Sequence, residues 1–522
     1  MIYPVEAFTA AERERLRPHF TNLDQPVFAI VGLPETTRAA LFARYSRYPG
    51  TLRRLFLDEF ADVDTAAVGG ESARAAALFD RVFVGYGDDS VAQLGGAHVA
   101  CEYVSNLVTK VLERPRLAGY LEQSTRYIAY DGQVPGLGYR YYRDPEFGPA
   151  YEQAMDALFE TYTSMLPRVA EWVDARFERD PAEPPGAHVR AVRAKALDLV
   201  RGVLPAASLS HVGIYASGQT YEQLVLHLLA HPLPEARRYG ELILNAVRAV
   251  IPSFVARVDQ PDRGGAWISY LQSRDDAALQ VAERLGLRDD DGDADGPSVT
   301  LLRAHGDEHE ALAALLFEAT TVSEDQVAAL LAPLDDEQLA ELFATLVGER
   351  ANRRHRPGRG LESLHYRFEI VSDYGAFRDL QRHRMLTVQW QSLTPDLGAD
   401  VPEELDAAGV GDEYRAALER SADAYRALAA AGQGPAAAYA LCLGYRIRYV
   451  LELNAREAMH VIELRSSREG HPSYRAIAHE LHRLIATVHP RVAAAMHHVD
   501  TSVEPRLERM PSELRSERRG AT

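Results

Sequence analysis

The residues best suited to chemistry lie together between positions 381 and 392, in the order Gln-Arg-His-Arg-Met-Leu-Thr-Val-Gln-Trp-Gln-Ser. Arg382 and Arg384 flank His383, and Ser392 follows after seven intervening residues. Guanidinium groups are planar, permanently charged donors that suit a phosphate or a carbonyl edge, and an imidazole ring can stack or donate a hydrogen bond. Two interpretations are open from these residues alone: an anion site beside a flat ring, or a solvated basic turn.

A second stretch reads Asn454-Ala-Arg456-Glu-Ala-Met-His460-Val-Ile-Glu-Leu-Arg465. Arg465 follows Asn454 by eleven residues, which is about three helical turns, so both can lie on one face of a helix. Because Arg465 stands among apolar residues, it needs a polar partner. A purely structural alternative is also open, since Asn454 and Glu457 are spaced as a helix-capping pair and His460 could simply pair with a neighbouring glutamate.

An earlier segment repeats the first pattern in degenerate form: Arg114-Pro115-Arg116, seven residues, then Ser124. Beyond it, Glu122, Ser124 and Arg126 alternate, so in an extended stretch they would share one face. Such a face could hold a sugar hydroxyl and a phosphate, or it could be an exposed polar strand. The recurrence predicts an internal duplication; the alternative is chance recurrence in an arginine-rich chain.

The elements that must position these residues are mostly helical. Apolar residues recur at helical spacing in segments spread over the whole chain: 10–60, 97–112, 148–178, 187–203, 221–229, 236–255, 411–431, 435–468 and 473–497. Residues 364–371 suit a strand or a helix, and 503–522 are polar and expected to fray. The acidic, glycine-containing run at 286–297 predicts a solvated linker between a first unit, 1–285, and a second unit, 298–522.

Length and composition narrow the class of protein. At 522 residues the chain is long enough for two or more domains. The net charge of −18 argues against broad nucleic-acid or membrane-surface binding, although clustered arginines can still form a positive pocket. Cys101 and Cys442 are the two cysteines, too few for a disulfide framework or a zinc cluster, and no metal site is predicted. Without a signal peptide or membrane-length apolar run, the expected location is cytoplasmic.

Together, the two motifs resemble the signature of the flavin-dependent thymidylate synthases, in which Arg-His-Arg, seven residues and Ser precede a helix carrying Asn-x-Arg, then His or Asn, then Arg. The resemblance implies an α+β fold that is predominantly helical, with two tandem units, each a small sheet flanked by long helices. It also implies the reductive methylation of dUMP to dTMP, with FAD as cofactor and with NADPH and methylenetetrahydrofolate as co-substrates.

The two halves depart from the family pattern in complementary ways. In the first half, Pro115 replaces the histidine and Leu228 replaces the final arginine, but Arg201 precedes a Val-Leu-Pro turn as in the family. In the second half, Trp390, Thr394 and Ala438 replace expected polar residues, and Asp379 stands where the family has glutamine. We therefore expect one composite site that draws residues from both halves.

The resemblance assigns the following roles to residues of this chain. The dUMP-binding set is Glu122, Ser124, Arg126, Arg201, Arg382 and Arg465. The FAD-binding set is Arg382, His383, Arg384, Asn454, Arg456 and His460, with Arg359 as a further candidate for the pyrophosphate. Arg465 is the residue expected to stabilise charge developing on the pyrimidine.

Two functions remain open at this stage. The chain is either an active thymidylate synthase or a paralogue that binds FAD or a pyrimidine nucleotide as a regulator or scaffold without turnover. The family assembles as a homotetramer, so the resemblance implies a homodimer of this chain, with four units in all. The expected partners are the nucleotide and the folate, with no nucleic acid and no membrane.

Overall fold

The computed structural model describes residues 6–26, 28–45, 48–61, 92–287, 296–502 and 507–520. The chain is α+β and predominantly helical, with two small sheets, which confirms the predicted fold class. It forms two compact units: unit 1 comprises 1–104, 111–123 and 210–288, and unit 2 comprises 105–110, 124–209 and 289–522. Residues 124–209 thus belong to the same compact unit as the second half of the sequence.

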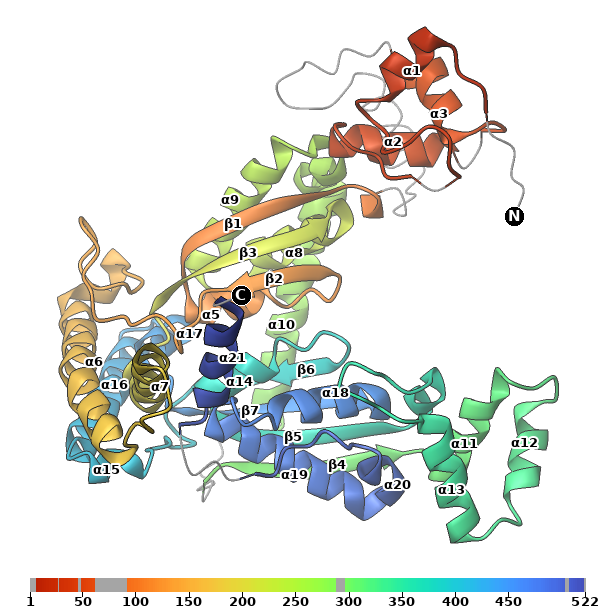
Figure 1. The fold of residues 1–522 in the computed structure, drawn as a ribbon. Helices are drawn as coiled ribbons and strands as arrows, with labels where there is room; N and C mark the ends of the chain where they lie inside the picture. The colour runs from red at the N-terminus through yellow and green to blue at the C-terminus, as the bar shows by residue number, and fades with distance from the viewer. Residues whose placement is uncertain are drawn as a thin grey trace. The chain divides into compact units, whose positions relative to one another are not determined.

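Unit 1 contains a three-stranded sheet in the order β1-β3-β2 (Figure 1). The strands are β1 (Gly96–Ser105), β2 (Ala118–Glu122) and β3 (Leu209–Ser217). β2 and β3 are antiparallel, and Glu122 lies opposite Val212. Several helices complete the unit: α1 (Ala10–Leu16), α2 (Glu35–Tyr45), α3 (Leu52–Leu55), α8 (Gly218–Ala230), α9 (Pro234–Arg248) and α10 (Ala266–Arg284).

Unit 2 is built on a four-stranded antiparallel sheet in the order β4-β5-β7-β6. The strands are β4 (Ser298–His305), β5 (His365–Asp373), β6 (Thr387–Trp390) and β7 (Arg446–Asn454). β7 alternates buried and half-buried residues, with Ile447, Tyr449, Leu451 and Leu453 buried, as expected for a strand with one face on the core. β5 and β7 pair along their full length, from His365 opposite Asn454 to Asp373 opposite Arg446.

Helices begin directly where these two central strands end. α14 (Tyr374–Leu380) follows β5 and leads into the Arg-His-Arg segment, and α18 (Ala455–Arg465) follows β7. The remaining helices of unit 2 are α6 (Gly148–Arg176), α7 (Pro185–Val200), α11 (Glu308–Phe317), α12 (Glu324–Leu331), α13 (Asp336–Val347), α15 (Glu404–Ala407), α16 (Gly411–Ala430), α17 (Gly434–Ala437), α19 (Pro472–Val488), α20 (Pro490–Ala494) and α21 (Met510–Gly520). α5 (Asn106–Leu112) spans the boundary between the units.

Helix α18 is fixed from its buried side by a charged pair. Both Nη atoms of Arg350 contact the Glu463 carboxylate, and the two side chains are 3% and 0% exposed. Because breaking such a pair would leave an uncompensated buried charge, the position of α18 in the unit is strongly constrained. The C-terminal residue of that helix is Arg465.

Two predicted helices were wrong. Residues 97–112 form β1 and then α5, and residues 435–468 contain β7 before α18. Residues 97–112 are largely apolar, and such a run suits a buried strand as well as a helix. Within 435–468, residues 446–454 alternate between half-buried and buried positions, which is the pattern of a strand with one buried face. The other predicted helices agree in outline, for example α6 at 148–176, α7 at 185–200 and α16 at 411–430.

Some predictions concern positions outside the described residues. Most of the predicted linker, 286–297, falls there, because residues 288–295 are not described. The ranges 1–285 and 298–522 were predicted as the two duplicated units of the sequence, and these boundaries remain predictions. Residues 510–520, expected to fray, form helix α21.

Among the residues that the structure describes, no helix combines the length and the apolar character needed to cross a membrane.

Candidate functional site

Four arginines from distant parts of the sequence meet around one carboxylate within unit 2. Arg126 lies in a turn after β2, Arg201 follows α7, Arg382 follows α14, and Arg465 ends α18. All four lower the pKa of Asp379, whose side chain is half-buried. We call these four side chains and Asp379 the arginine cluster. It contains the four arginines of the predicted dUMP-binding set.

Asp379 lies within 4 Å of both Arg201 and Arg465. Its Oδ2 is 3.6 Å from Nη1 of Arg201, and its Oδ1 is 3.8 Å from Nη1 of Arg465. The backbone carbonyl of Asp379 also accepts a hydrogen bond from Nη2 of Arg465. Burial alone would raise the pKa of the Asp379 carboxyl, but Arg382 and the other three guanidinium groups outweigh it and lower this pKa. The carboxylate is therefore held in its ionised form.

Arg126 is fixed by a second carboxylate. Its Nε and Nη2 donate to the two oxygens of Asp198 at 2.7 and 2.6 Å, and its Nη1 donates to the Tyr474 hydroxyl at 2.8 Å. This two-point geometry is the strong form of a guanidinium–carboxylate pair. Although burial opposes it, the pair lowers the pKa of Asp198 to about 2.

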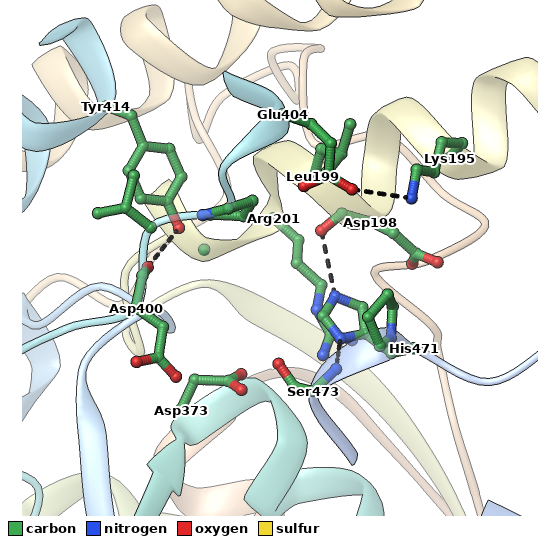
Figure 2. Close-up of a pocket in the computed structure, with 15 residues that line it drawn as sticks. Lys195, Asp198, Leu199, Arg201, Asp373, Asp400, Glu404, Tyr414, His471 and Ser473 are labelled. Atoms are coloured by element: carbon green, nitrogen blue, oxygen red, sulfur yellow. Dashed lines mark hydrogen bonds and ion pairs between the residues drawn. The ribbon is translucent and has the colours of Figure 1, made fainter. Parts of the chain in front are cut away.

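Arg201 retains hydrogen-bonding capacity. It is 4% exposed, and its Nη2 has no hydrogen-bond partner among the described residues. Gly375 makes this position possible, because a Cβ there would lie 3.0 Å from that nitrogen. Figure 2 shows Arg201 beside Asp198 and His471. A buried donor without a partner is unfavourable, so Nη2 is available to a ligand.

The charges of this region do not balance. Four guanidinium groups face two carboxylates, Asp198 and Asp379, both with lowered pKa values. His471 is nearby, and burial lowers its pKa to about 3, so it is neutral at pH 7. Asp373 also lies beside Arg201, and burial raises its pKa. Among these side chains, arginines therefore outnumber carboxylates. This excess of arginines complements an anion such as a phosphate monoester.

His383 is joined directly to Arg465. The Nε of Arg465 donates to Nε2 of His383 at 2.9 Å. Because the guanidinium can only donate, Nε2 must be the acceptor, and burial together with Arg465 lowers the pKa of His383 well below its usual value. The ring is therefore neutral with its proton on Nδ1, which faces the Glu457 carboxylate at 3.7 Å.

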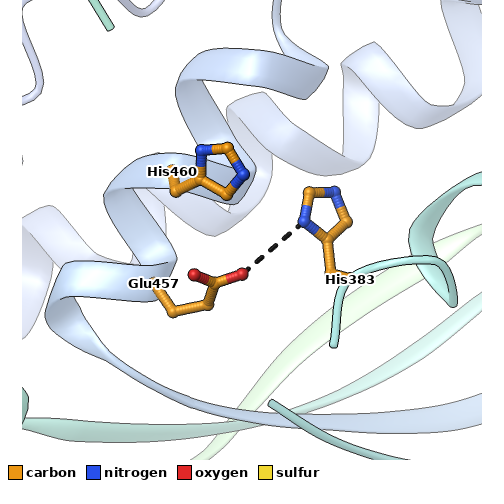
Figure 3. A group of neighbouring side chains, drawn as sticks. All are labelled: His383, Glu457 and His460. Carbon is orange, nitrogen blue, oxygen red and sulfur yellow. Dashed lines mark ion pairs between the residues drawn. The ribbon is translucent and has the colours of Figure 1, made fainter. Parts of the chain in front are cut away.

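His383, Glu457 and His460 form a compact group (Figure 3). The two imidazole rings meet edge to face, with centroids 5.6 Å apart. Two histidines and a carboxylate are also a metal-ligand set. However, His383 cannot offer Nδ1 to a metal while Arg465 donates to Nε2, since a neutral imidazole must carry one proton. The arrangement thus fits a hydrogen-bonded aromatic wall better than a metal centre.

The other predicted FAD-binding residues are engaged in different ways. Asn454 caps α18 by accepting the Glu457 backbone N–H at 2.9 Å, so the capping interpretation of this residue is confirmed. Arg456 donates to the Pro357 carbonyl at 2.9 Å and contacts Glu362 at 3.2 Å. Arg359 is exposed and pairs with the same Glu362, and Arg384 is exposed.

The predicted Glu122–Arg126 face is not a continuous strand. β2 ends at Glu122, and residues 125–127 form a turn. Within it, the Ser124 hydroxyl accepts the Arg126 backbone N–H at 3.2 Å. A serine that bonds to its own backbone in this way favours a turn over an extended chain, so the expectation of a shared strand face was wrong. Glu122 lies in unit 1 and is buried; Ser124 begins a segment of unit 2.

Sequence reasoning missed three members of the site. Asp198, Tyr474 and His471 hold Arg126 or contact Asp198. Of these three residues, only Asp198 could have been suspected from the sequence, because it stands three residues before Arg201 at the end of a helix. Asp379 was noted as a departure from the family pattern, but its place at the centre of four arginines follows from the tertiary structure alone.

The fold consists of two compact units, and the arginine cluster lies in one of them. Comparison with known proteins adds the family. The family model for thymidylate synthase complementing protein matches residues 39–253 and 301–491, and the chain belongs to this family. The double match confirms two family-related regions in one chain.

This chain is similar to other proteins over nearly the whole length of both chains. A UPF0159 protein of Chlamydia muridarum is 36% identical, over 97% of this chain and 98% of its own. A UPF0159 protein of Chlamydia pneumoniae is also 36% identical, over 99% of both chains. One from Thermoplasma acidophilum is 29% identical, over 92% of this chain and 98% of its own. The similarity therefore extends over nearly the whole length of this chain and of these relatives.

Proposed function

We propose that the protein is a flavin-dependent thymidylate synthase that methylates dUMP to dTMP, with the arginine cluster as its nucleotide site. The observation that carries the proposal is the convergence of Arg126 and Arg201 with Arg382 and Arg465 around Asp379. If motif residues had been lost at random after duplication, the arginines kept in the two halves would not be expected to lie together in the folded protein. Membership of the family supports the same reaction class.

The charge of the cluster supports a phosphate monoester as ligand. An excess of arginines over carboxylates in a partly buried region favours a bound anion, because an unpaired buried charge is strongly unfavourable. A phosphate group would be such an anion. Arg201 and Arg465, each able to donate from several N–H groups, would orient the ligand, and Arg465 would stabilise negative charge that develops on the pyrimidine ring.

The residues around His383 are compatible with FAD. His383 and His460 offer two aromatic faces, and the exposed guanidinium group of Arg384 lies next in the chain, which suits a ring system with an attached pyrophosphate. When bound, reduced FAD would supply hydride, with NADPH as the source of electrons and methylenetetrahydrofolate as the source of the one-carbon unit. The chain itself would position the ligands and exclude water.

The decisive experiment is the visible absorption spectrum of the purified protein, reconstituted with FAD and then titrated with dUMP. We expect a flavin band that dUMP perturbs, followed by release of tritium from [5-³H]dUMP when NADPH and methylenetetrahydrofolate are added. Protein that binds neither FAD nor dUMP would rule out the synthase. If the protein binds FAD and its spectrum changes with dUMP but no tritium is released, the protein binds both ligands without catalysing the reaction.

One observation favours that second function, a nucleotide- or flavin-binding paralogue without turnover. Asp379 already places a carboxylate among the arginines, 3.6 Å from Arg201 and 3.8 Å from Arg465. This internal anion would weaken the binding of an external one. We also propose a homodimer, as the family resemblance implies, which light scattering coupled to size-exclusion chromatography would test as a mass of twice 57.8 kDa.

A further inference from the structure

A cavity of about 180 Å³ in unit 2 is lined by Arg201 but by none of the other three arginines of the cluster. Apolar walls come from Leu199, Val401, Pro402 and Pro472. The volume is below the roughly 300–1,000 Å³ of pockets that enclose whole drug-sized ligands. The cavity therefore suits a single ring system that forms part of a larger ligand.

Two buried polar atoms beside this cavity have no hydrogen-bond partner among the described residues. They are Nη2 of Arg201, a donor, and Oδ2 of Asp373, an acceptor. Both residues line the cavity and are only 4% and 6% exposed. Figure 2 shows the carboxylate of Asp373 and the hydroxyl of Ser473 facing the same space. A donor and an acceptor side by side are what a ring with an adjacent carbonyl and N–H needs.

The other charged residues of the lining are already paired. Asp400 accepts from Arg446 at 2.6 Å, and Asp198 is bound by Arg126. Lys195 contacts Glu508 at 2.7 Å and Glu404 at 3.4 Å. The cavity thus lacks the excess positive charge of the arginine cluster, which favours an uncharged occupant.

We propose that this cavity binds the lactam edge of a neutral heterocycle, with Arg201 donating to its carbonyl oxygen and Asp373 accepting from its N–H. This inference rests on the proposed function, because the two ligands of that reaction that have such an edge are the pyrimidine of the nucleotide and the pterin of the folate. The shared chemistry is the lactam, and the experiment separates the two sources.

Asp373→Asn is the variant that tests the assignment. Oδ1 of Asp373 caps α14 by accepting the Ala376 N–H at 2.8 Å, and asparagine caps helices as well as aspartate does. The substitution therefore keeps the helix but replaces the acceptor Oδ2 by an NH₂ donor, which cannot accept from the ligand N–H. Asp335→Asn is a matched control, because Asp335 caps α13 in the same way and does not line the cavity.

The probes are 2′-deoxyuridine, which has the pyrimidine without the phosphate, and tetrahydropterin, which has the folate ring without its tail. Binding is measured by calorimetry on the full-length protein, with thermal melts to confirm that both variants fold. We expect one of the probes to bind the wild type and to lose at least tenfold affinity in Asp373→Asn but not in Asp335→Asn. Loss with deoxyuridine assigns the cavity to the nucleotide, and loss with tetrahydropterin assigns it to the folate.

The inference is overturned if the wild type binds neither probe, or if folded Asp373→Asn binds both as the wild type does. Neither result depends on phosphate binding by the arginine cluster, because neither probe carries a phosphate. Failure of the proposed function would appear separately, as an absence of dUMP binding.

Discussion

Nε of Arg465 donates a hydrogen bond to Nε2 of His383 across 2.9 Å. This bond joins the last residue of α18 to the middle residue of the Arg-His-Arg segment. It links the proposed nucleotide set, to which Arg465 belongs, with the proposed flavin set, to which His383 belongs. It also fixes the tautomer of a buried, neutral imidazole.

The first prediction concerns that tautomer. At pH 7, nitrogen-detected NMR of the histidine rings should show His383 protonated on Nδ1, assigned by the signal lost in His383→Gln. Because Arg465 occupies Nε2, addition of Zn²⁺ should leave the signal unchanged. A ring protonated on Nε2, or one that shifts with Zn²⁺, would contradict the hydrogen bond and reopen the metal interpretation.

The second prediction separates folding from binding at Arg126. Arg126→Ala strands the buried Asp198 carboxylate, which should cost about 3–5 kcal/mol of unfolding free energy. The double variant Arg126→Ala/Asp198→Asn should recover much of that stability but still bind dUMP at least 100-fold more weakly than the wild type. Arg465→Ala should show the same loss of binding.

The control for this pair is Arg238→Ala, which removes an exposed guanidinium that pairs with Glu241 on the same helix. Its dUMP affinity should be unchanged within twofold. If the double variant binds dUMP like the wild type, Arg126 is not part of the nucleotide site and the composite site is wrong.

The third prediction concerns the internal anion. Asp379→Asn removes one negative charge from among four guanidinium groups and makes the net charge of the region more positive by one. Because the charges lie a few ångströms apart in a buried region, affinity for inorganic phosphate should rise on the order of tenfold or more. Asp406→Asn makes the same chemical change at a surface pair with Arg415 and should have no effect.

Phosphate titration by calorimetry gives the readout, and it also bears on the two candidate functions. A variant that binds phosphate while the wild type binds neither phosphate nor dUMP would favour a site neutralised by Asp379. Equal affinity in the variant and the wild type would show that Asp379 does not face the anion.

The fourth prediction concerns pH. Nδ1 of His471 accepts the Ser473 N–H and caps α19, while its other nitrogen contacts the Asp198 carbonyl. Burial lowers its pKa from 6.5 to about 3. The unfolded chain therefore binds a proton that the folded protein does not, so stability contributed by neutral His471 is present above pH 6.5 and is lost as the pH falls toward 3, by about 1.4 kcal/mol per pH unit.

Denaturant unfolding at several pH values would measure this slope. His471→Asn keeps a capping side chain but cannot titrate, so its stability should fall less steeply between pH 6.5 and 4 than that of the wild type. His309→Asn, at an exposed position, should leave the slope unchanged. Identical slopes in His471→Asn and the wild type would contradict the proposed burial of a neutral ring.

The sequence by itself determined the family, the mostly helical α+β class and the identity of the four arginines. These follow from local features: motif spacing, helical periodicity and residue chemistry, each of which is contained in a few consecutive residues. The need for a partner for Arg465 was also predictable, because an arginine among apolar residues must be compensated.

Only the tertiary structure decided which groups meet. It placed Asp379 among the four arginines, paired Arg126 with Asp198, and turned the predicted helix at 435–468 into β7 followed by α18. The reason is physical: residues 446–454 alternate like a strand inside a longer segment that favours a helix, and long-range pairing with β5 decides between the two. Ion pairs between residues 72 positions apart, as for Arg126 and Asp198, leave no local trace in the sequence.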